Sequence, residues 1–274
     1  MSCIHPTAII HDSAQLGENV QIGAFSIVGP DVEIGDGCVL MEHVHVNCNT
    51  IMGRENTIHP FTALGGEPQD RKFHGERTVL RLGDRNDIRE HVTMHRGTGN
   101  GGGETVIGSD CLVMVGSHVA HDCIIGDHVT IANQVMLAGH VIMGDGSAIG
   151  GGAGVHHYAT IGRLAFVGGM ARVARDVPPF VIVEGHPAEV RAVNTIGLVR
   201  AGVDGNDIDQ LKACFKRLFR DAAPAKDRLP DLRAAHTDTP IVLELCDAIE
   251  AAGDGTHGRA REAVRRDDRW SRTR

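Results

Sequence analysis

The chain has 274 residues, of which 42% are hydrophobic and 23% charged, a composition typical of a globular protein with a sizeable buried core. Its formal net charge of −8 argues against general binding to nucleic acid or to a membrane surface. The seven cysteines are odd in number and include no Cys-x-x-Cys pair, so we expect a reducing, cytoplasmic setting rather than disulfides or a zinc knuckle. The N-terminal segment does not have the pattern of a signal peptide, and no stretch resembles a membrane span.

A six-residue repeat begins within the first ten residues and continues through the first two-thirds of the chain. An aliphatic residue stands at every sixth position, and glycine often follows it, as in IGAFSI and IGDGCV. Twelve consecutive positions match from Ile107 to Val173, which is far beyond chance. This period suits neither an amphipathic helix nor an alternating strand, and it is the hexapeptide pattern of a parallel β-helix.

The expected fold class is therefore mainly β, with a left-handed parallel β-helix over residues 1–187. Each hexad supplies one short strand and one corner of a triangular prism, and three hexads complete one coil. Successive coils should lie about 4.8 Å apart, the usual spacing of paired strands. Prisms of this type are known to be left-handed, although the period itself does not fix the hand.

Two segments interrupt the repeat. They are residues 65–81, GGEPQDRKFHGERTVLR, and residues 96–105, RGTGNGGGET, and both are rich in glycine and charge. The repeat keeps its frame across the first segment and shifts by one position across the second. Loops that project from a rigid scaffold often carry function, so we expect both segments to leave the prism as functional loops.

The hexads fade after about residue 178, where the prolines of DVPPF cannot donate to a strand ladder. Residues 188–274 are predicted to form an α-helical C-terminal domain. NDIDQLKACFKRLF has the apolar spacing of an amphipathic helix, and PIVLELCDAIEAAG, which starts with proline, predicts another. The tail from Gly258 holds seven arginines and is expected to fray.

Several histidines fall about one coil apart. His140 stands one coil and one position after His121, and His156 and His157 follow just short of one further coil, so all four should lie near one prism edge, with His118 close by. A histidine cluster is costly if it is buried without partners. Along edges that meet in a trimer it would line a cleft between subunits. Acid–base chemistry and a metal site, as in the hexapeptide carbonic anhydrases, both suit such a cluster.

The order of the motifs is more specific than the repeat. QDRKFHGE, HRGT followed by GGG, SHVAHDCIIG, LAGHV, GGAGVHH, and VGG before DVPP occur in that order. With this set the chain resembles the acyl-[acyl-carrier-protein]–UDP-N-acetylglucosamine O-acyltransferases, the first enzymes of lipid A biosynthesis, over nearly its whole length. The resemblance implies a homotrimer of left-handed β-helices with active sites between subunits and with no metal or other cofactor.

The resemblance also implies the reaction, in which an (R)-3-hydroxyacyl chain passes from acyl carrier protein to the 3-hydroxyl of UDP-N-acetylglucosamine. His121, in the H-x-A-H-D motif, corresponds to the general base, a task that a neutral imidazole suits. Asp122 corresponds to the residue that orients the base, which requires a bent corner because neighbours in an extended strand point to opposite faces. The backbone amide of Gly139 corresponds to the oxyanion donor.

The substrate contacts of the family carry over residue by residue. Lys72 matches a lysine near the nucleotide phosphates, and Gln69 and Asp70 match sugar and acyl contacts on the same loop. Gly169, in VGGMAR, matches the position that measures acyl length, and without a side chain it should leave the groove open to long donors. The other matches line the substrate cleft or belong to the C-terminal domain: His95, His118, His140, His156, Asn194 and Arg200. His157, next to His156, is expected to bind substrate as well.

Four positions depart from the family pattern. His157 stands where glutamine is usual, and Ile196, Val199 and Ala201 stand where the family has charged residues. These departures affect nucleotide and carrier-protein binding rather than the reaction class, and Arg191 is a candidate substitute. The carrier protein is acidic and this chain is net negative, so docking needs a local basic patch. The expected patch consists of Arg200, Lys212, Lys216, Arg217 and Arg220.

Three other functions remain open at this stage. A related hexapeptide acyltransferase would acylate an amine, either on a 3-amino sugar or in a later N-acylation. A metal-dependent carbonic anhydrase would contain stoichiometric zinc. An inactive scaffold is the third, and the presence of both His121 and Lys72 argues against it.

Overall fold

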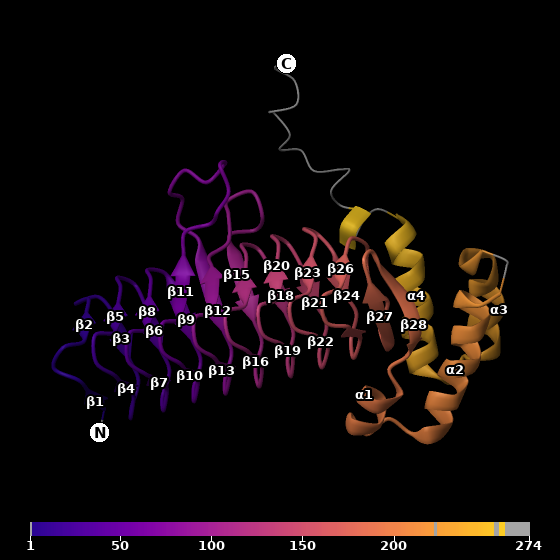
Figure 1. Cartoon of the computed structure of the whole chain (residues 1–274), viewed down its shortest axis with the longest axis horizontal. Helices are drawn as coiled ribbons and strands as arrows, with labels where there is room; N and C mark the ends of the chain where they lie inside the picture. Colours follow the sequence, from indigo (N-terminus) through magenta and orange to yellow (C-terminus); the bar gives the residue numbers. More distant parts are fainter. Residues whose placement is uncertain (1, 222–223, 255–257, 261–274) are drawn as a thin grey trace, which may run out of the picture.

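The structure is a computed structural model that describes residues 2–221, 224–254 and 258–260. A long prism of three parallel sheets leads into a group of helices at its C-terminal end (Figure 1). From β1 to β26, consecutive strands belong to the three sheets in rotation, so each strand pairs with the strand three elements before it, and β27 then pairs with β25. This arrangement confirms the parallel β-helix predicted from the six-residue repeat.

The strands of the prism are short because each hexad provides only one side of a coil. Sheet A contains β1 (Cys3–Ile4), β4 (Gln21–Ile22), β7 (Val39–Leu40), β10 (Thr57–Ile58), β13 (Asp87–Ile88), β16 (Leu112–Val113), β19 (Thr130–Ile131), β22 (Ala148–Ile149), β25 (Phe166–Val167), β27 (Val181–Gly185) and β28 (Ala188–Val193). Sheet B contains β2 (Ile9–Ile10), β5 (Ile27–Val28), β8 (His45–Val46), β11 (Ala63–Gly66), β14 (Thr93–His95), β17 (His118–Val119), β20 (Met136–Leu137), β23 (Gly154–Val155) and β26 (Arg172–Val173). Sheet C contains β3 (Gln15–Leu16), β6 (Glu33–Ile34), β9 (Thr50–Met52), β12 (Val79–Leu82), β15 (Glu104–Ile107), β18 (Ile124–Ile125), β21 (Ile142–Met143) and β24 (Thr160–Ile161).

Strand register explains how the repeat behaves across its two interruptions. Where the repeat is unbroken, partners lie one coil of three hexads apart, as Cys3 and Gln21 do. Ile58 pairs with Ile88, which is one coil and two further hexads along the chain, so the first loop adds two whole hexads. Ile88 in turn pairs with Val113, so the second loop adds one hexad and one extra position. The first addition preserves the frame and the second shifts it by one.

Both loops leave the prism from the same edge (Figure 1). We name the three edges by the sheets that they join along the chain: the A–B, B–C and C–A corners. The first loop connects β11 to β12 and the second connects β14 to β15, so both belong to the B–C corner. The first loop is shorter than the predicted segment 65–81 because residues 80–82 already pair with strand β9.

The aliphatic residue of each hexad points into the prism, where it forms the core. Leu40, Leu64, Met94 and Ile131 are each at most 1% exposed. Burial of this kind contributes about 0.8 kcal/mol per methylene group. Each coil therefore covers the apolar layer of the next, and the stack forms a rigid support for its corners.

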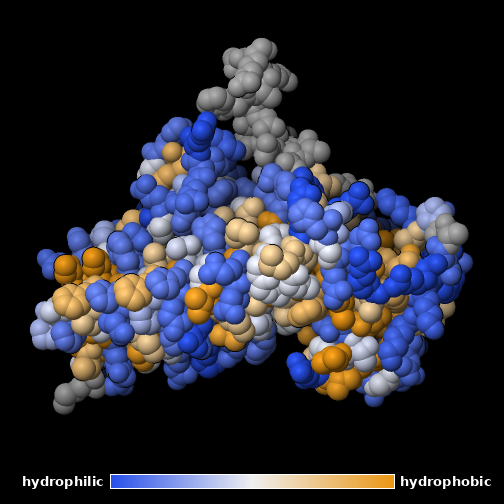
Figure 2. Space-filling model, in the orientation of Figure 1, coloured by the Kyte–Doolittle hydropathy of each residue, from blue (hydrophilic) through white to orange (hydrophobic). Residues whose placement is uncertain are grey.

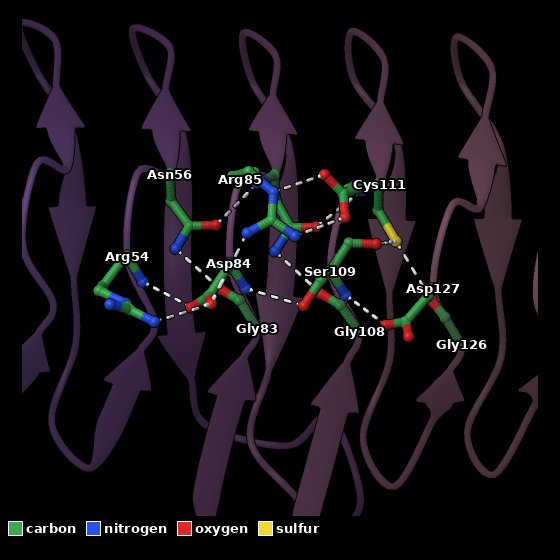
Figure 3. Close-up of polar contacts among 12 residues, drawn as sticks. Arg54, Asn56, Gly83, Asp84, Arg85, Gly108, Ser109, Cys111, Gly126 and Asp127 are labelled. Carbon is green, nitrogen blue, oxygen red and sulfur yellow. Dashed lines mark hydrogen bonds and ion pairs between the residues drawn. The ribbon is translucent and has the colours of Figure 1, made fainter.

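Polar side chains at the C–A corner link one coil to the next (Figure 3). The carboxylate of Asp84 accepts a hydrogen bond of 2.8 Å from the N–H of Arg54. Ser109 accepts one of 3.0 Å from the N–H of Asp84, and Asp127 accepts one of 2.7 Å from the N–H of Ser109. A Cβ atom on Gly108 would lie 2.4 Å from the Asp127 carboxylate, so this contact requires the glycine that follows the aliphatic residue in the repeat.

The A–B corner carries an exposed ladder of stacked rings. Phe25, His43, Phe61 and His91 follow one another in successive coils, with ring centroids 5.1–5.2 Å apart. Phe25 is 59% exposed and Phe61 is 54% exposed. Figure 2 shows hydrophobic residues at the surface of the N-terminal coils, whereas the projecting loops are hydrophilic. One edge of the prism thus presents a strip of stacked phenyl and imidazole rings to its surroundings.

The C-terminal region begins with a strand rather than a helix. β28 pairs antiparallel with β27 at the end of sheet A, so the predicted boundary between residues 187 and 188 falls inside a hairpin. Pairing satisfies backbone groups that the last strand of a parallel sheet would otherwise leave open. The helices that follow are α1 (Thr195–Arg200), α2 (Gly205–Phe219), the short 3-10 helix η1 (Ala225–Arg228), α3 (Leu229–Ala235) and α4 (Pro240–Asp254).

Helix packing fixes this region against the end of the prism. The predicted apolar face of α2 is buried, and Asp204 caps the helix by accepting a hydrogen bond from Asn206. Arg163, at the C–A corner, donates a 2.8 Å hydrogen bond to Glu244 of α4. None of the helices in the described residues is long and apolar enough to cross a membrane. The tail predicted to fray lies, beyond residue 260, outside the described residues.

Candidate active site

His121 and Asp122 form a hydrogen-bonded pair at the B–C corner, between β17 and β18. The Nδ1 atom of His121 lies 2.6 Å from Oδ2 of Asp122. Asp122 has a φ of 60°, the left-handed conformation that turns the corner. The bend brings two sequence neighbours to the same side, which an extended strand would not allow. Because Nδ1 faces the carboxylate, Nε2 is the nitrogen of His121 left for chemistry.

Asp122 is the most enclosed carboxylate of this corner, with a side chain only 1% exposed. Its oxygens accept hydrogen bonds from the Thr98 N–H at 2.8 Å and from the Thr98 hydroxyl at 2.7 Å. Burial by itself would raise the pKa of Asp122, but the bonds from His121 and Thr98 and the nearby His140 lower that pKa below its usual value. Asp122 is therefore an ionised partner for the imidazole.

Gly139 lies directly under the His121 ring, one coil further along the same corner. A Cβ atom on Gly139 would be 2.6 Å from Cε1 and 2.8 Å from Nε2 of His121, so any side chain here would displace the imidazole. Among the hydrogen bonds within the described residues, none uses the N–H of Gly139. This corner therefore presents a backbone donor next to the free nitrogen of His121.

The histidines stack along the corner as their spacing predicts. The rings of His121 and His140 meet edge to face with centroids 5.2 Å apart. His140 stacks on Tyr158 at 4.3 Å, and the rings of His156 and His157 lie 4.0 Å apart. Tyr158 was not among the predicted residues, although it stands one full coil after His140. Coil arithmetic applied to every residue type would have found it.

Two further histidines in this region are kept neutral by their surroundings. Burial, helped by the neighbouring His118, lowers the pKa of His95 to about 4. Burial also lowers the pKa of His118, whose Nδ1 lies 2.7 Å from the hydroxyl of Thr93. The Nδ1 of His95 has no hydrogen-bond partner among the described residues. Both rings therefore offer neutral donor and acceptor groups rather than positive charge.

A cavity of about 500 Å³ opens beside these groups on the face of sheet B. It contains five of the predicted site residues together with apolar groups of three successive coils. We call it the histidine cavity. Its lining comprises Gln69, His118, Ala120, His121, Met136, Leu137, Ala138, Gly139, Gly154, Val155, His156, Arg172 and Val173. An elongated apolar ligand with one reactive polar group would suit this composition.

The first projecting loop supplies Gln69 to this cavity. Asp70 and Lys72 lie on the same loop, where the Lys72 Nζ is 3.6 Å from the Asp70 carboxylate. The loop is anchored by Arg96, a residue 4% exposed that donates to the carbonyl of Gly65 at 2.9 Å. Neither Asp70 nor Lys72 lines the histidine cavity itself.

Asn194 and Arg200 lie elsewhere, in a cavity of about 930 Å³ on the face of sheet A next to α1. We call this the Asn194 cavity. Its lining also includes His128 and Ile196. The Asn194 side chain caps α1 by accepting from Gly197 and donates to the Leu164 carbonyl at 2.8 Å, so much of its bonding capacity serves the fold. One chain therefore does not bring Asn194 and Arg200 together with His121.

Comparison with known proteins identifies the family. Residues 176–258 match the model described as Udp N-acetylglucosamine O-acyltransferase, domain 2, and residues 13–48 and 104–139 match the bacterial transferase hexapeptide repeats. An acyl-[acyl-carrier-protein]–UDP-N-acetylglucosamine O-acyltransferase of Bartonella bacilliformis is 44% identical over 250 residues, which cover 91% of each chain. The chain belongs to the UDP-N-acetylglucosamine O-acyltransferase family.

Solved structures of this family share the whole fold. The UDP-N-acetylglucosamine O-acyltransferase of Moraxella catarrhalis matches with a TM-score of 0.88 and 39% identity, over 90% of this chain and 96% of that one. The UDP-N-acetylglucosamine acyltransferase of Arabidopsis matches with a TM-score of 0.82 and 31% identity, over 93% and 98%. The likeness spans both the prism and the helical region.

Two predictions about the acyltransferase site look different in the structure. Gly169 lies at the A–B corner and lines neither cavity, whereas Arg172 lines the histidine cavity. Within the expected basic patch, Lys212 pairs with Asp209 at 3.0 Å and Arg217 lies 3.9 Å from Asp231. The patch residues lie on or next to α1 and α2 as predicted, but acidic neighbours offset part of their charge.

The site also offers a set of atoms that would suit a metal ion. Ligand atoms of His121, Asp122 and His140 lie within 4.8 Å of one another. However, both oxygens of Asp122 already accept hydrogen bonds, from Thr98 and His121. Such a carboxylate orients an imidazole well, and a metal would have to displace those donors. In this acyltransferase family member the geometry fits acid–base chemistry better than metal binding.

Proposed function

We propose that this chain transfers an (R)-3-hydroxyacyl group from acyl carrier protein to the 3-hydroxyl of UDP-N-acetylglucosamine, the reaction that opens lipid A biosynthesis. The observation that carries the proposal is the His121–Asp122 pair beside the Gly139 amide, which no group in the described residues uses, in a chain 44% identical to an enzyme named for this reaction. The apolar groups of Ala120, Met136 and Ala138 line the same cavity, and Met136 is 58% exposed, which favours an acyl chain.

His121 acts as the general base. Its Nε2 removes the proton from the sugar hydroxyl while that oxygen attacks the thioester carbonyl. Asp122 holds the ring in the tautomer that leaves Nε2 free, and it stabilises the imidazolium that forms. The proton then passes from Nε2 to the departing thiolate, so the products are the sugar ester and the free thiol of the carrier protein.

Gly139 stabilises the tetrahedral intermediate. Its N–H donates to the oxygen that becomes negative when the carbonyl carbon turns tetrahedral. Neutral His95 and His118 bind polar groups of the substrates without introducing a positive charge that would make His121 a weaker base. Gln69, Asp70 and Lys72 approach the nucleotide sugar from the first loop.

The working enzyme is a homotrimer whose sites lie between subunits. The histidine cavity faces outward on sheet B and the Asn194 cavity faces outward on sheet A of the same chain. Packing sheet A of one subunit against sheet B of the next would join the two cavities, because the two faces are adjacent sides of the prism. The A–B corner, with its exposed Phe25 and Phe61, would then lie at the centre of the trimer.

The reaction is tested by incubating the purified chain with UDP-N-acetylglucosamine and a panel of hydroxyacyl carrier proteins and by weighing the products. An ester of the expected mass supports the proposal. A 3-amino sugar nucleotide in a parallel reaction tests the amine acceptor, and its exclusive acylation would contradict the proposed acceptor. Zinc analysis of the same preparation tests the carbonic anhydrase alternative, which stoichiometric metal would favour.

The shared site is tested by mixing two inactive variants. Arg200→Ala and His121→Ala damage different cavities, so a mixed trimer would contain interfaces with both cavities intact. Dissociating and reassociating the two together should restore part of the activity, whereas each variant treated alone stays inactive. Light scattering measures the assembly in parallel. An active monomer, or no recovery in proven mixed trimers, would contradict the shared-site arrangement.

A further inference from the structure

The second projecting loop passes over the buried side of the catalytic pair. It leaves strand β14 after His95 and rejoins the prism at strand β15, within the sequence RGTGNGGGET. The N–H groups of Gly101 and Gly103 both donate to the carbonyl of Thr98, at 3.0 Å and 2.9 Å, and close the loop into a tight turn. Thr98 itself is 4% exposed. The loop therefore encloses Thr98 instead of presenting it to solvent.

Only glycine can occupy the place where this loop crosses the Asp122 side chain. A Cβ atom on Gly101 would lie 2.1–2.3 Å from the carboxyl carbon and both oxygens of Asp122. Gly102 and Gly103 have φ values of 114° and 88°, which side chains disfavour. The glycine run thus allows a close contact with one particular carboxylate.

Thr98 makes two hydrogen bonds to that carboxylate, one to each oxygen. The Thr98 N–H donates to Oδ1 at 2.8 Å, and the hydroxyl donates to Oδ2 at 2.7 Å. Oδ2 also faces Nδ1 of His121 at 2.6 Å. Two donors in this fork geometry fix both the position and the plane of the carboxylate, and the hydroxyl shares its acceptor with the imidazole.

We propose that Thr98 is a positioning residue of the acyl transfer, and that the inserted loop which carries it serves to hold Asp122 ionised and aligned with His121. The inference rests on the proposed function. The Thr98 hydroxyl withdraws electron density from Oδ2, which moderates how strongly Asp122 holds the proton on Nδ1. The enclosing loop keeps water away from the same oxygens. Thr98 and Asp122 thereby set both the direction and the basicity of the imidazole.

The test compares Thr98→Val with Thr98→Ser. Valine keeps the shape and the backbone N–H but removes the hydroxyl, whereas serine restores the hydroxyl. Thr98→Val should lower kcat at neutral pH by roughly ten- to a hundredfold, the range expected for one hydrogen bond to a charged group, with little change in KM for the sugar nucleotide. Thr98→Ser should recover most of the lost rate.

The pH profile separates positioning from a merely structural role. Without the hydroxyl, Oδ2 is a stronger acceptor and favours the protonated imidazole, so the acid limb of kcat/KM should move to higher pH in Thr98→Val. A variant that only loosened the loop would raise KM and leave that limb in place. The matched control is Thr62→Val, which removes another buried hydroxyl, bonded at 2.8 Å to the Arg89 carbonyl at the A–B corner. This control should keep the wild-type profile.

The outcomes separate this inference from the proposed function. A wild-type chain without transfer activity contradicts the proposed function. An active wild type with an unchanged Thr98→Val profile, or a Thr98→Ser variant no better than Thr98→Val, overturns the role of Thr98 alone. Thermal unfolding of all three variants shows whether a lost activity reflects a lost fold, and in that case the Thr98→Ser profile alone decides.

Discussion

The C–A and B–C corners of the prism use similar polar residues for different purposes. At the C–A corner, Asp84, Ser109 and Asp127 bind backbone N–H groups of the preceding coil, so every rung repeats the last (Figure 3). At the B–C corner the repeat is interrupted twice, and Asp122 binds Thr98 and His121 instead of a neighbouring rung. The regular corner holds the stack together, and the interrupted corner positions the groups proposed to react.

Both corners hold polar groups without hydrogen-bond partners in the described residues, but the one at the C–A corner, the Oγ of Ser147, lines neither cavity. The backbone N–H of Gly139 and the Nδ1 of His95, both at the B–C corner, make no hydrogen bond within the part of the chain that the structure describes. Unused polar groups of this kind lower stability, and they are retained where a substrate can satisfy them. Substitutions at the two corners should therefore separate activity from stability.

The largest expected effect is on catalysis at the B–C corner. His121→Ala should lower kcat more than about a hundredfold, the range typical for losing a general base, while KM for the sugar nucleotide changes little. Steady-state kinetics with both substrates measures this. His11→Ala, an exposed histidine bonded to Ser13 in the first coil, is the control and should behave as wild type. An effect confined to KM would remove His121 from the role of base.

A smaller loss of kcat is expected from Gly139→Ala, also at the B–C corner. The added methyl group would lie 2.6 Å from the His121 ring, so the imidazole must shift away from its present position. Displacements of about 1 Å can cost about a hundredfold in rate, and we expect a fall in kcat of about ten- to a hundredfold. Gly205→Ala, where a Cβ atom meets nothing within 4 Å, is the control. Full activity of Gly139→Ala would show that the ring is not confined there.

Much of this site was predictable from the sequence because the prism converts separation into position. The spacing of one coil and one position placed His121 and His140 on one edge, and their rings lie 5.2 Å apart. The frame shift between residues 96 and 105 marked the second loop. The conformation of that loop was not predictable, because a period carries no information about an insertion, and so the contact of Thr98 with Asp122 was missed.

The C-terminal residues show a different limit. Coil arithmetic places residues along an edge, but the location of Asn194 and Arg200 depends on the antiparallel β27–β28 hairpin and on how α1 packs beside sheet A. Neither feature follows from the hexads. The resemblance to the family predicts that these residues act together with His121, whereas the single chain places them on different faces, so that prediction depends on the proposed trimer.

Acid should lower the free energy of unfolding, because His95 at the B–C corner is held neutral in the folded chain. Its pKa in the folded chain is about 4, below the ordinary value of 6.5, so the unfolded chain binds a proton first as the pH falls. Stability should therefore be complete above pH 6.5 and decline as the pH falls towards 4. Removing the titrating ring in His95→Asn should reduce this decline by about 1 kcal/mol, allowing for the partial exposure of the ring. Urea unfolding of the wild type and of His95→Asn at pH 7 and pH 5 measures this decline. Equal declines in the two proteins would contradict its assignment to His95.

A similarly small effect, on stability alone, is expected at the C–A corner. Ser109→Ala removes the acceptor for the N–H of Asp84, which is 3.0 Å away, but leaves the Ser109 N–H bonded to Asp127. One rung of the ladder is lost in a partly exposed position, so we expect the free energy of unfolding to fall by about 1 kcal/mol. Because Ser109 lines neither the histidine cavity nor the Asn194 cavity, kcat and KM should stay at their wild-type values. Urea unfolding and steady-state kinetics on the same preparation test both statements. If the rate fell together with the stability, the two corners would be coupled, and the separation between a supporting corner and a reacting corner would not hold.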